Sequence, residues 1–300
     1  MDSLKQRIRN VTLVGLTVNL ILSGAKLVGG IVASSSAVVA DGVHSLSDTV
    51  TDIAILIGVR YWTAPPDENH PHGHHRIETL VTAVIGLVLA GVAIGLMVEA
   101  VTTLASPSDA QPPGWPALGV ALVSIASKES LYRYTLKNGR SLNSAALLAN
   151  AWHQRSDMLS SIPAALAVLG TKIFPDLTML DSIGAIIVSL LILHTAYHIV
   201  FPALAQLVDT SAGPEIQKEI ESLAMAIDGV KHVHAVRTRF MGAKITVDMH
   251  IEVDGRMTVQ SGHALAGRVK HHIIDNGPEV ADVVVHLEPE GDHLHSAPPV

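Results

Sequence analysis

The chain has 300 residues, of which 48% are hydrophobic and only 16% are charged, whereas about 25% are charged in a typical soluble domain. This composition excludes a disordered chain and argues against a wholly soluble protein. The sequence has no cysteine, which excludes disulfide scaffolds, thiolate metal sites and cysteine nucleophiles. A net charge of −7 argues against nucleic acid as a partner. The 17 histidines are unusual, since histidine is the commonest metal ligand at neutral pH.

Six apolar stretches precede Asp209, and a membrane-spanning helix needs about 20 mostly apolar residues. They cover residues 11–33, 38–61, 79–98, 110–127, 142–169 and 182–208. We therefore predict six transmembrane helices within residues 1–209. Basic residues gather in the segments on one side, although Lys172 is an exception; they are Lys5, Arg7, Arg9, Arg60, Arg76, Arg133, Lys137 and Arg140. This asymmetry predicts a multi-pass protein of the inner membrane with both termini in the cytoplasm.

The pattern changes after Asp209. Residues 216–227 and 259–274 have helical periodicity, whereas residues 230–240, 245–253 and 280–287 have the character of strands. The order α-β-β-α-β predicts a small cytoplasmic α+β domain of ferredoxin or metallochaperone type over residues 210–290. Residues 291–300 are predicted to form a loose tail.

The second predicted helix carries a stripe of ionisable residues. Asp41, His44, Asp48 and Asp52 lie within about 80° of one another on a helix that turns 100° per residue. Carboxylates inside a bilayer cost about 2.5–3.5 kcal/mol each, so such a stripe must face water, a partner or a cation. His44 and Asp48 are spaced i, i+4, so both side chains can reach one point.

The fifth predicted helix repeats this spacing with His153 and Asp157, and Asn150 lies one turn before His153. Two imidazoles and two carboxylates form a tetrahedral ligand set that suits Zn²⁺, and that Cd²⁺, Co²⁺ or Fe²⁺ could also occupy. The alternative is that these residues only bond to one another inside a helix bundle. Asp41 and Asp52 lie nearer the helix ends, where they could hydrate an access path or assist binding.

The runs Asp-Gly-Val-His-Ser-Leu-Ser-Asp (41–48) and Asn-Ala-Trp-His-Gln-Arg-Ser-Asp (150–157) resemble signatures of the cation diffusion facilitator family. The resemblance covers nearly the whole chain. It implies a homodimer in the lipid bilayer that exports a divalent metal ion from the cytoplasm in exchange for protons. The best-known bacterial zinc transporters of this family carry aspartate where this chain has His44, and the substitution favours zinc.

A histidine-rich tract, residues 67–75, follows the second helix, and such tracts are typical of metal binding. A solvated loop that binds metal weakly is the alternative. The family resemblance implies a second site made of Asp67, His70 and His74, which leaves His72 and His75 spare. It also implies an interlock between Arg76 and Asp209, where the membrane domain meets the cytoplasmic domain.

In the predicted cytoplasmic domain, the resemblance implies a site for two metal ions at a dimer interface. Its residues are His234, His250, His263, His286 and Glu288. Relatives usually have aspartate at the position of Glu288. We interpret His271, His272, His293 and His295 as solvated surface residues, and His194 and His198 as packing residues.

Several other functions remain to be weighed against zinc export. Transporters of iron, cobalt, cadmium or manganese belong to the same class, although two imidazoles argue against manganese, which prefers oxygen ligands. A metal sensor that does not transport is another possibility. An intramembrane metalloprotease is disfavoured because the sequence has no His-Glu-x-x-His motif, and ATP-driven transport is disfavoured because it has no phosphate-binding loop.

Overall fold

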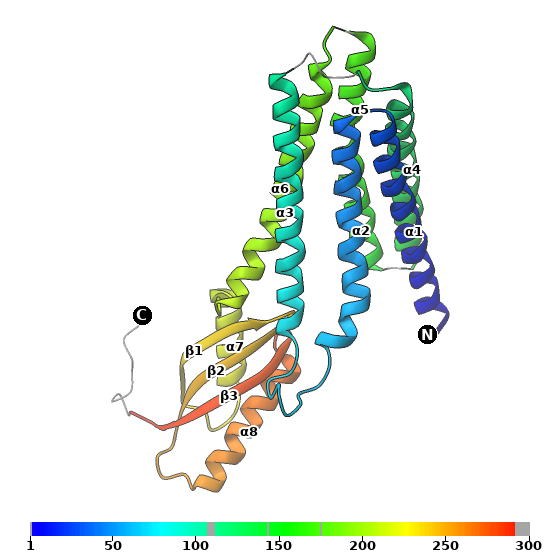
Figure 1. Ribbon diagram of the computed structural model, residues 1–300. Coiled ribbons are helices and arrows are strands. Elements are labelled where there is room, and N and C mark those ends of the chain that lie inside the picture. The colour runs from blue at the N-terminus through cyan, green and yellow to red at the C-terminus, as the bar shows by residue number, and fades with distance from the viewer. Residues whose placement is uncertain (1, 107–111, 143, 175, 292–300) are drawn as a thin grey trace. The chain divides into compact units, whose positions relative to one another are not determined.

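The computed structural model describes residues 2–106, 112–142, 144–174 and 176–291. The chain forms two compact units (Figure 1). One unit contains Met1–Ile57 and Val84–Val200; the other contains Gly58–Ala83 and Phe201–Val300. The end of the sixth helix and the loop after the second helix thus group with the C-terminal elements.

Six long helices lie where the sequence predicts them, and all are longer than predicted at one end or both. They are α1 (Asp2–Val32), α2 (Ser36–Trp62), α3 (Arg76–Ala105), α4 (Trp115–Ser141), α5 (Ala145–Ile173) and α6 (Met179–Leu207). Among the described residues, three segments are long and apolar enough to cross a membrane: Arg9–Val32, Arg76–Ala105 and Met179–Leu207. The other three long helices contain most of the ionisable residues discussed below, which lowers their hydropathy.

The connection between α4 and α5 is shorter than expected. Arg133, Lys137 and Arg140 were predicted to lie in a loop, but they lie in α4, which continues to Ser141. Arginine and lysine are good helix formers, and Arg133 forms a 2.6 Å ion pair with Glu129 one turn earlier. Ser144 then caps α5 by accepting a hydrogen bond from the backbone N–H of Leu147.

The first unit packs largely through small side chains, as helices in membranes do. Its core is dominated by buried alanines of α2 to α6 and by Ala33, directly after α1. The glycines of α1 and α2 permit the closest approach. A Cβ atom on Gly30 would lie 2.8 Å from the backbone nitrogen of Val39, and one on Gly42 would lie 3.0 Å from that of Leu27. This contact brings the polar residues of α1 and α2 together.

The C-terminal elements follow the predicted order α-β-β-α-β. They are α7 (Pro214–Met225), β1 (His232–Met241), β2 (Lys244–Val253), α8 (Val259–Asn276) and β3 (Val280–Pro289). The sheet has the order β1-β2-β3, with β1 antiparallel and β3 parallel to β2. Both helices pack on one face of the sheet (Figure 1), against alternate residues of β2 such as Val247, Met249 and Ile251. The polar residues of β2 therefore lie on the face without helices.

Candidate metal sites

Three of the four side chains predicted to bind the transported ion come together between α2 and α5. His44 and Asp48 lie one turn apart on α2, Asp157 lies on α5, and one ligand atom from each is within 4.8 Å of the other two. His44 is 7% exposed and Asp157 is 5% exposed. The group offers one imidazole nitrogen and carboxylate oxygens from two residues, a donor set that divalent transition-metal ions accept.

His153 lies at the edge of this group. Its Nδ1 is 3.8 Å from Oδ1 of Asp157, but 62% of its side chain is exposed. Residues four apart share one helix face, so His153 remains within reach of an ion held by Asp157. Its role as a fourth ligand stays a prediction.

A buried lysine of α1 joins the helices beside the group. Nζ of Lys26 is 2.8 Å from Oδ2 of Asp41, and neither side chain has any exposed surface. The same ammonium donates hydrogen bonds of 2.9 Å to the hydroxyls of Ser45 and Ser161, and Ser161 in turn donates to Asp41. We expected Asp41 to line an access path or to assist binding, but it is enclosed in this ion pair.

A second buried lysine, Lys128 of α4, faces the ligand group itself. Its Nζ is 3.5 Å from Oδ2 of Asp157 and 3.5 Å from the hydroxyl of Ser45. Neither lysine is among the residues that the sequence predicts for the site. The available signal was their position, because Lys26 interrupts one apolar stretch and Lys128 directly follows another. A lysine buried there requires an acidic partner.

A cavity of about 480 Å³ lies between α1, α2 and α5. Asp52 and Asn150, the remaining polar residues predicted on α2 and α5, both line it, together with Arg9 of α1. Asp52 lies one turn beyond Asp48 on the same helix. The cavity therefore lies toward the end of α2 that precedes the histidine-rich loop.

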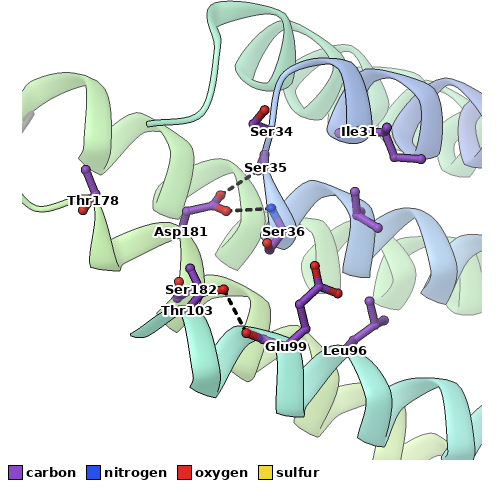
Figure 2. A pocket seen from close by; sticks show the side chains of 12 residues that line it. Ile31, Ser34, Ser35, Ser36, Leu96, Glu99, Thr103, Thr178, Asp181 and Ser182 are labelled. Carbon is purple, nitrogen blue, oxygen red and sulfur yellow. Dashed lines mark hydrogen bonds between the residues drawn. The ribbon is translucent and has the colours of Figure 1, made fainter. Parts of the chain in front are cut away.

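A second cavity, of about 560 Å³, lies at the other end of α2 (Figure 2). Asp181 of α6 points from its wall toward the start of α2, where it accepts hydrogen bonds from the hydroxyl of Ser35, at 2.6 Å, and the backbone N–H of Ser36, at 2.7 Å. This carboxylate thus caps α2, as an anion at a helix N-terminus does. Glu99 of α3 lines the same cavity and is exposed.

The loop residues Asp67, His70 and His74 also come together, with ligand atoms within 4.8 Å of one another. Oδ1 of Asp67 is 3.1 Å from Nδ1 of His70, and Oδ2 is 3.3 Å from Nε2 of His74. The backbone N–H of His70 donates to Asp67, which lowers the pKa of that carboxyl from its ordinary value. A turn through Gly73, whose φ is +82°, brings His74 back toward Asp67. A carboxylate that stays ionised next to two imidazoles is suited to a divalent cation.

Four other predicted residues near the loop lie outside this ligand group. Arg76 and Asp209 form an ion pair within the second unit. His72 and His75 line a cavity of about 430 Å³ with residues of the sheet.

On the face of the sheet without helices, His234, His250 and Glu288 form a further group. Nδ1 of His250 is 2.8 Å from Oε1 of Glu288, and Nε2 of His234 is 3.1 Å from Oε2. His286 lies at the edge of this group, with its Nε2 3.6 Å from Oε1 of Glu288. His263 is exposed on α8, which covers the opposite face of the sheet, so it does not reach this group within one chain.

The structure adds two residues that the sequence analysis missed, His232 and Glu252. With His234 they make another group whose ligand atoms lie within 4.8 Å of one another. The signal was the strand alternation, since residues two apart share a face.

The remaining histidines are separate from these groups. Within the single chain His194 and His198 are exposed on α6 with ring centroids 4.4 Å apart, and their interpretation as packing residues stays a prediction. His271 is exposed and His272 half-buried on α8. His293 and His295 lie outside the described residues.

Comparison with protein families decides how the two parts are classified. The family model for the cation efflux transmembrane domain matches residues 12–208, and that for the cytoplasmic domain of cation efflux proteins matches residues 212–290. The chain belongs to the cation diffusion facilitator family. This confirms a helical transmembrane domain followed by a small α/β domain, in a family of transporters rather than enzymes.

Individual relatives of this family member match it over most of their length. Manganese efflux system protein MneP of Bacillus subtilis (strain 168) is 32% identical over 286 residues, which cover 94% of this chain and 96% of MneP. Magnetosome protein MamB of Magnetospirillum gryphiswaldense is 31% identical over 261 residues, covering 87% and 86% of the two chains. The metal-bound C-terminal domain of the CzcD transporter from Thermotoga maritima is 30% identical and covers 26% of this chain and 92% of that structure, with a TM-score of 0.25.

Proposed function

We propose that the chain exports a divalent transition-metal ion from the cytoplasm in exchange for protons. The observation that carries the proposal is the buried group of His44, Asp48 and Asp157. Two ionised carboxylates are costly inside a membrane domain unless cations accompany them, and Lys128 supplies only one positive charge to this group. An ion that is bound there and released on either side satisfies this requirement and gives a transport cycle.

The order of features along α2 supports alternating access. From its N-terminus, α2 passes the cavity that contains Glu99, then the Lys26–Asp41 ion pair, then the ligand group, and finally the cavity that contains Asp52. We propose that the ion arrives through the Asp52 cavity. The Lys26–Asp41 pair then closes the path to the Glu99 cavity until the helices rearrange.

Proton exchange follows from the chemistry of the ligands. A neutral imidazole binds metal and an imidazolium does not, so protons and the ion compete for the same site. On the more acidic outer side, protonation of the ligands favours release. On the cytoplasmic side, loss of those protons favours binding of the next ion.

Zinc is the proposed cargo if His153 completes a set of two imidazoles and two carboxylates. Two observations favour a second candidate, manganese. The buried group contains only one imidazole, and oxygen ligands suit manganese. In addition, the chain resembles a manganese efflux protein over 96% of that relative.

We further propose a homodimer in the inner membrane with both termini in the cytoplasm. The match to the cytoplasmic domain of cation efflux proteins supports dimer formation. Arg60 and Arg140 in the last turns of α2 and α4 support the orientation. His263 could then reach a sheet site only from a second copy.

A flux assay in proteoliposomes with an imposed pH gradient tests the proposal. The wild type should take up zinc or manganese while protons move in the opposite direction, and Asp157→Asn should abolish both fluxes. Glu129→Gln is the matched control, because Glu129 pairs only with Arg133 of its own helix in the described structure. Metal binding without flux in the wild type would instead indicate a sensor.

A further inference from the structure

The face of the sheet without helices carries a compact array of metal-binding side chains. The register pairs His232 of β1 with Glu252 of β2, and Glu252 with Glu288 of β3. The adjacent row pairs His234, His250 and His286 across the same three strands. Four imidazoles and two carboxylates therefore lie side by side, more than one ion position of four ligands requires.

His234 stands between the two carboxylates. Its Nε2 is 3.1 Å from Glu288, while its Nδ1 faces Glu252, whose Oε1 is 3.9 Å away. Nδ1 is buried and has no hydrogen-bond partner among the described residues. Buried polar atoms are rarely left in this state. Nδ1 of His232 lies 3.7 Å from the same oxygen of Glu252, so two ring nitrogens and a carboxylate converge on one point.

The backbone around His234 is distorted in a way that is common near functional sites. The ladder between β1 and β2 has an irregularity between His234 and Arg237. Ala235 within it has a φ of +50°, a left-handed conformation that costs a residue with a side chain about 1–2 kcal/mol. The bulge allows His232 and His234 to share the face of Glu252 while the rest of β1 keeps its pairing.

We propose that His232, His234 and Glu252 form a second position for a divalent transition-metal ion on this sheet. The proposal rests on the proposed function in one respect only, which is that the ion is a divalent transition metal. A neutral imidazole binds metal through one nitrogen, so His234 serves either this outer position through Nδ1 or the inner position, with His250 and Glu288, through Nε2. When Nδ1 binds the ion, Nε2 stays 3.1 Å from Glu288, which orients the ring. The two positions therefore alternate.

Chemical modification of histidine by diethyl pyrocarbonate, read for each residue by mass spectrometry of the full-length protein, tests this proposal. His232 has 61% of its side chain exposed, so it should react readily in the absence of metal. Zinc chloride should protect His232 in part in the wild type, where the two positions compete for His234, and fully in a His250→Ala/His286→Ala variant. Glu252→Gln should weaken zinc protection of His232 at least about tenfold while His250 remains protected.

Two controls separate metal ligation from shielding. Asp248→Asn changes another carboxylate two residues before His250, and it should leave protection of His232 intact because Asp248 pairs with Arg239. His271, exposed on α8, should react equally with and without zinc. The proposal is overturned if zinc does not protect His232, if Glu252→Gln leaves that protection unchanged, or if the His250→Ala/His286→Ala variant removes it. Since the measurement reads binding at the sheet, it stays interpretable even if the flux assay fails.

Discussion

Lys26 and Asp41 form an ion pair of 2.8 Å between α1 and α2, and both side chains are fully buried. Removing one partner of a buried pair typically costs about 3–5 kcal/mol, whereas replacing both with apolar groups is often close to neutral. The pair therefore leads to a prediction about protein stability that does not depend on which ion is transported.

We expect Lys26→Met to lower the thermal stability of the detergent-solubilised protein strongly, because Asp41 is left as a buried, unpaired carboxylate. The Lys26→Met/Asp41→Leu variant should recover most of that stability. Thermal unfolding monitored by circular dichroism would measure both. A double variant as unstable as the single one would show that the serine hydroxyls around the pair, rather than the charges, dominate.

His153 should govern the choice of ion more than the occurrence of transport. Its side chain is largely exposed at the edge of the ligand group, so His153→Ala leaves His44, Asp48 and Asp157 in place. We expect its zinc affinity to fall at least about tenfold, with a smaller change for manganese, in competitive uptake by proteoliposomes. An equal loss for both ions would place His153 among the indispensable ligands.

Arg76 and Asp209 offer a charge-reversal experiment. Their side chains are 47% and 53% exposed, so the pair contributes only about 0–1 kcal/mol to stability, and a transport defect can be read directly. Arg76→Glu should lower flux, and Arg76→Glu/Asp209→Arg should restore part of it. Rescue should be incomplete because Asp209 has a φ of +60°, which arginine adopts less readily than aspartate. A double variant no better than Arg76→Glu would contradict the proposed interlock.

Metal binding at the loop site should weaken as the pH falls. The hydrogen bond from the backbone N–H of His70 keeps the pKa of Asp67 below its usual range, so Asp67 stays ionised while the imidazoles gain protons. Protons compete with the ion for the two imidazoles, so zinc affinity should fall between pH 7 and pH 5.5.

The loop contribution is the difference in zinc binding between the wild type and a His70→Ala/His74→Ala variant, measured by equilibrium dialysis. Glu68→Gln is the control in the same loop, since Glu68 is exposed and outside the ligand group. A pH-independent difference would exclude the two imidazoles as the ligands.

Much of the architecture could be predicted from the sequence because its signals are local. Long apolar stretches give the six helices, and the alternation from Ile245 to Val253 gives β2 with one buried face. The predicted end of α4 is too early, because Arg133, Lys137 and Arg140 favour a helix.

The candidate sites were predictable only where spacing along one element decides them. His44 and Asp48 follow from helical periodicity. The partners of Lys26 and Lys128 depend on contacts between helices, which no local pattern encodes. The exposure of His153 depends on the rotation of α5. His232 and Glu252 meet through the register of β1 and β2. A bulge shifts that register, and the residues that form the bulge have no distinctive sequence pattern.

The close contact of α1 and α2 at Gly30 and Gly42 has a mechanical consequence. Two backbones this near each other, with the side chains of Val39 and Leu27 packed against the glycines, leave little space to absorb a displacement. A tilt of α2 must therefore carry α1 with it or separate the pair cleanly.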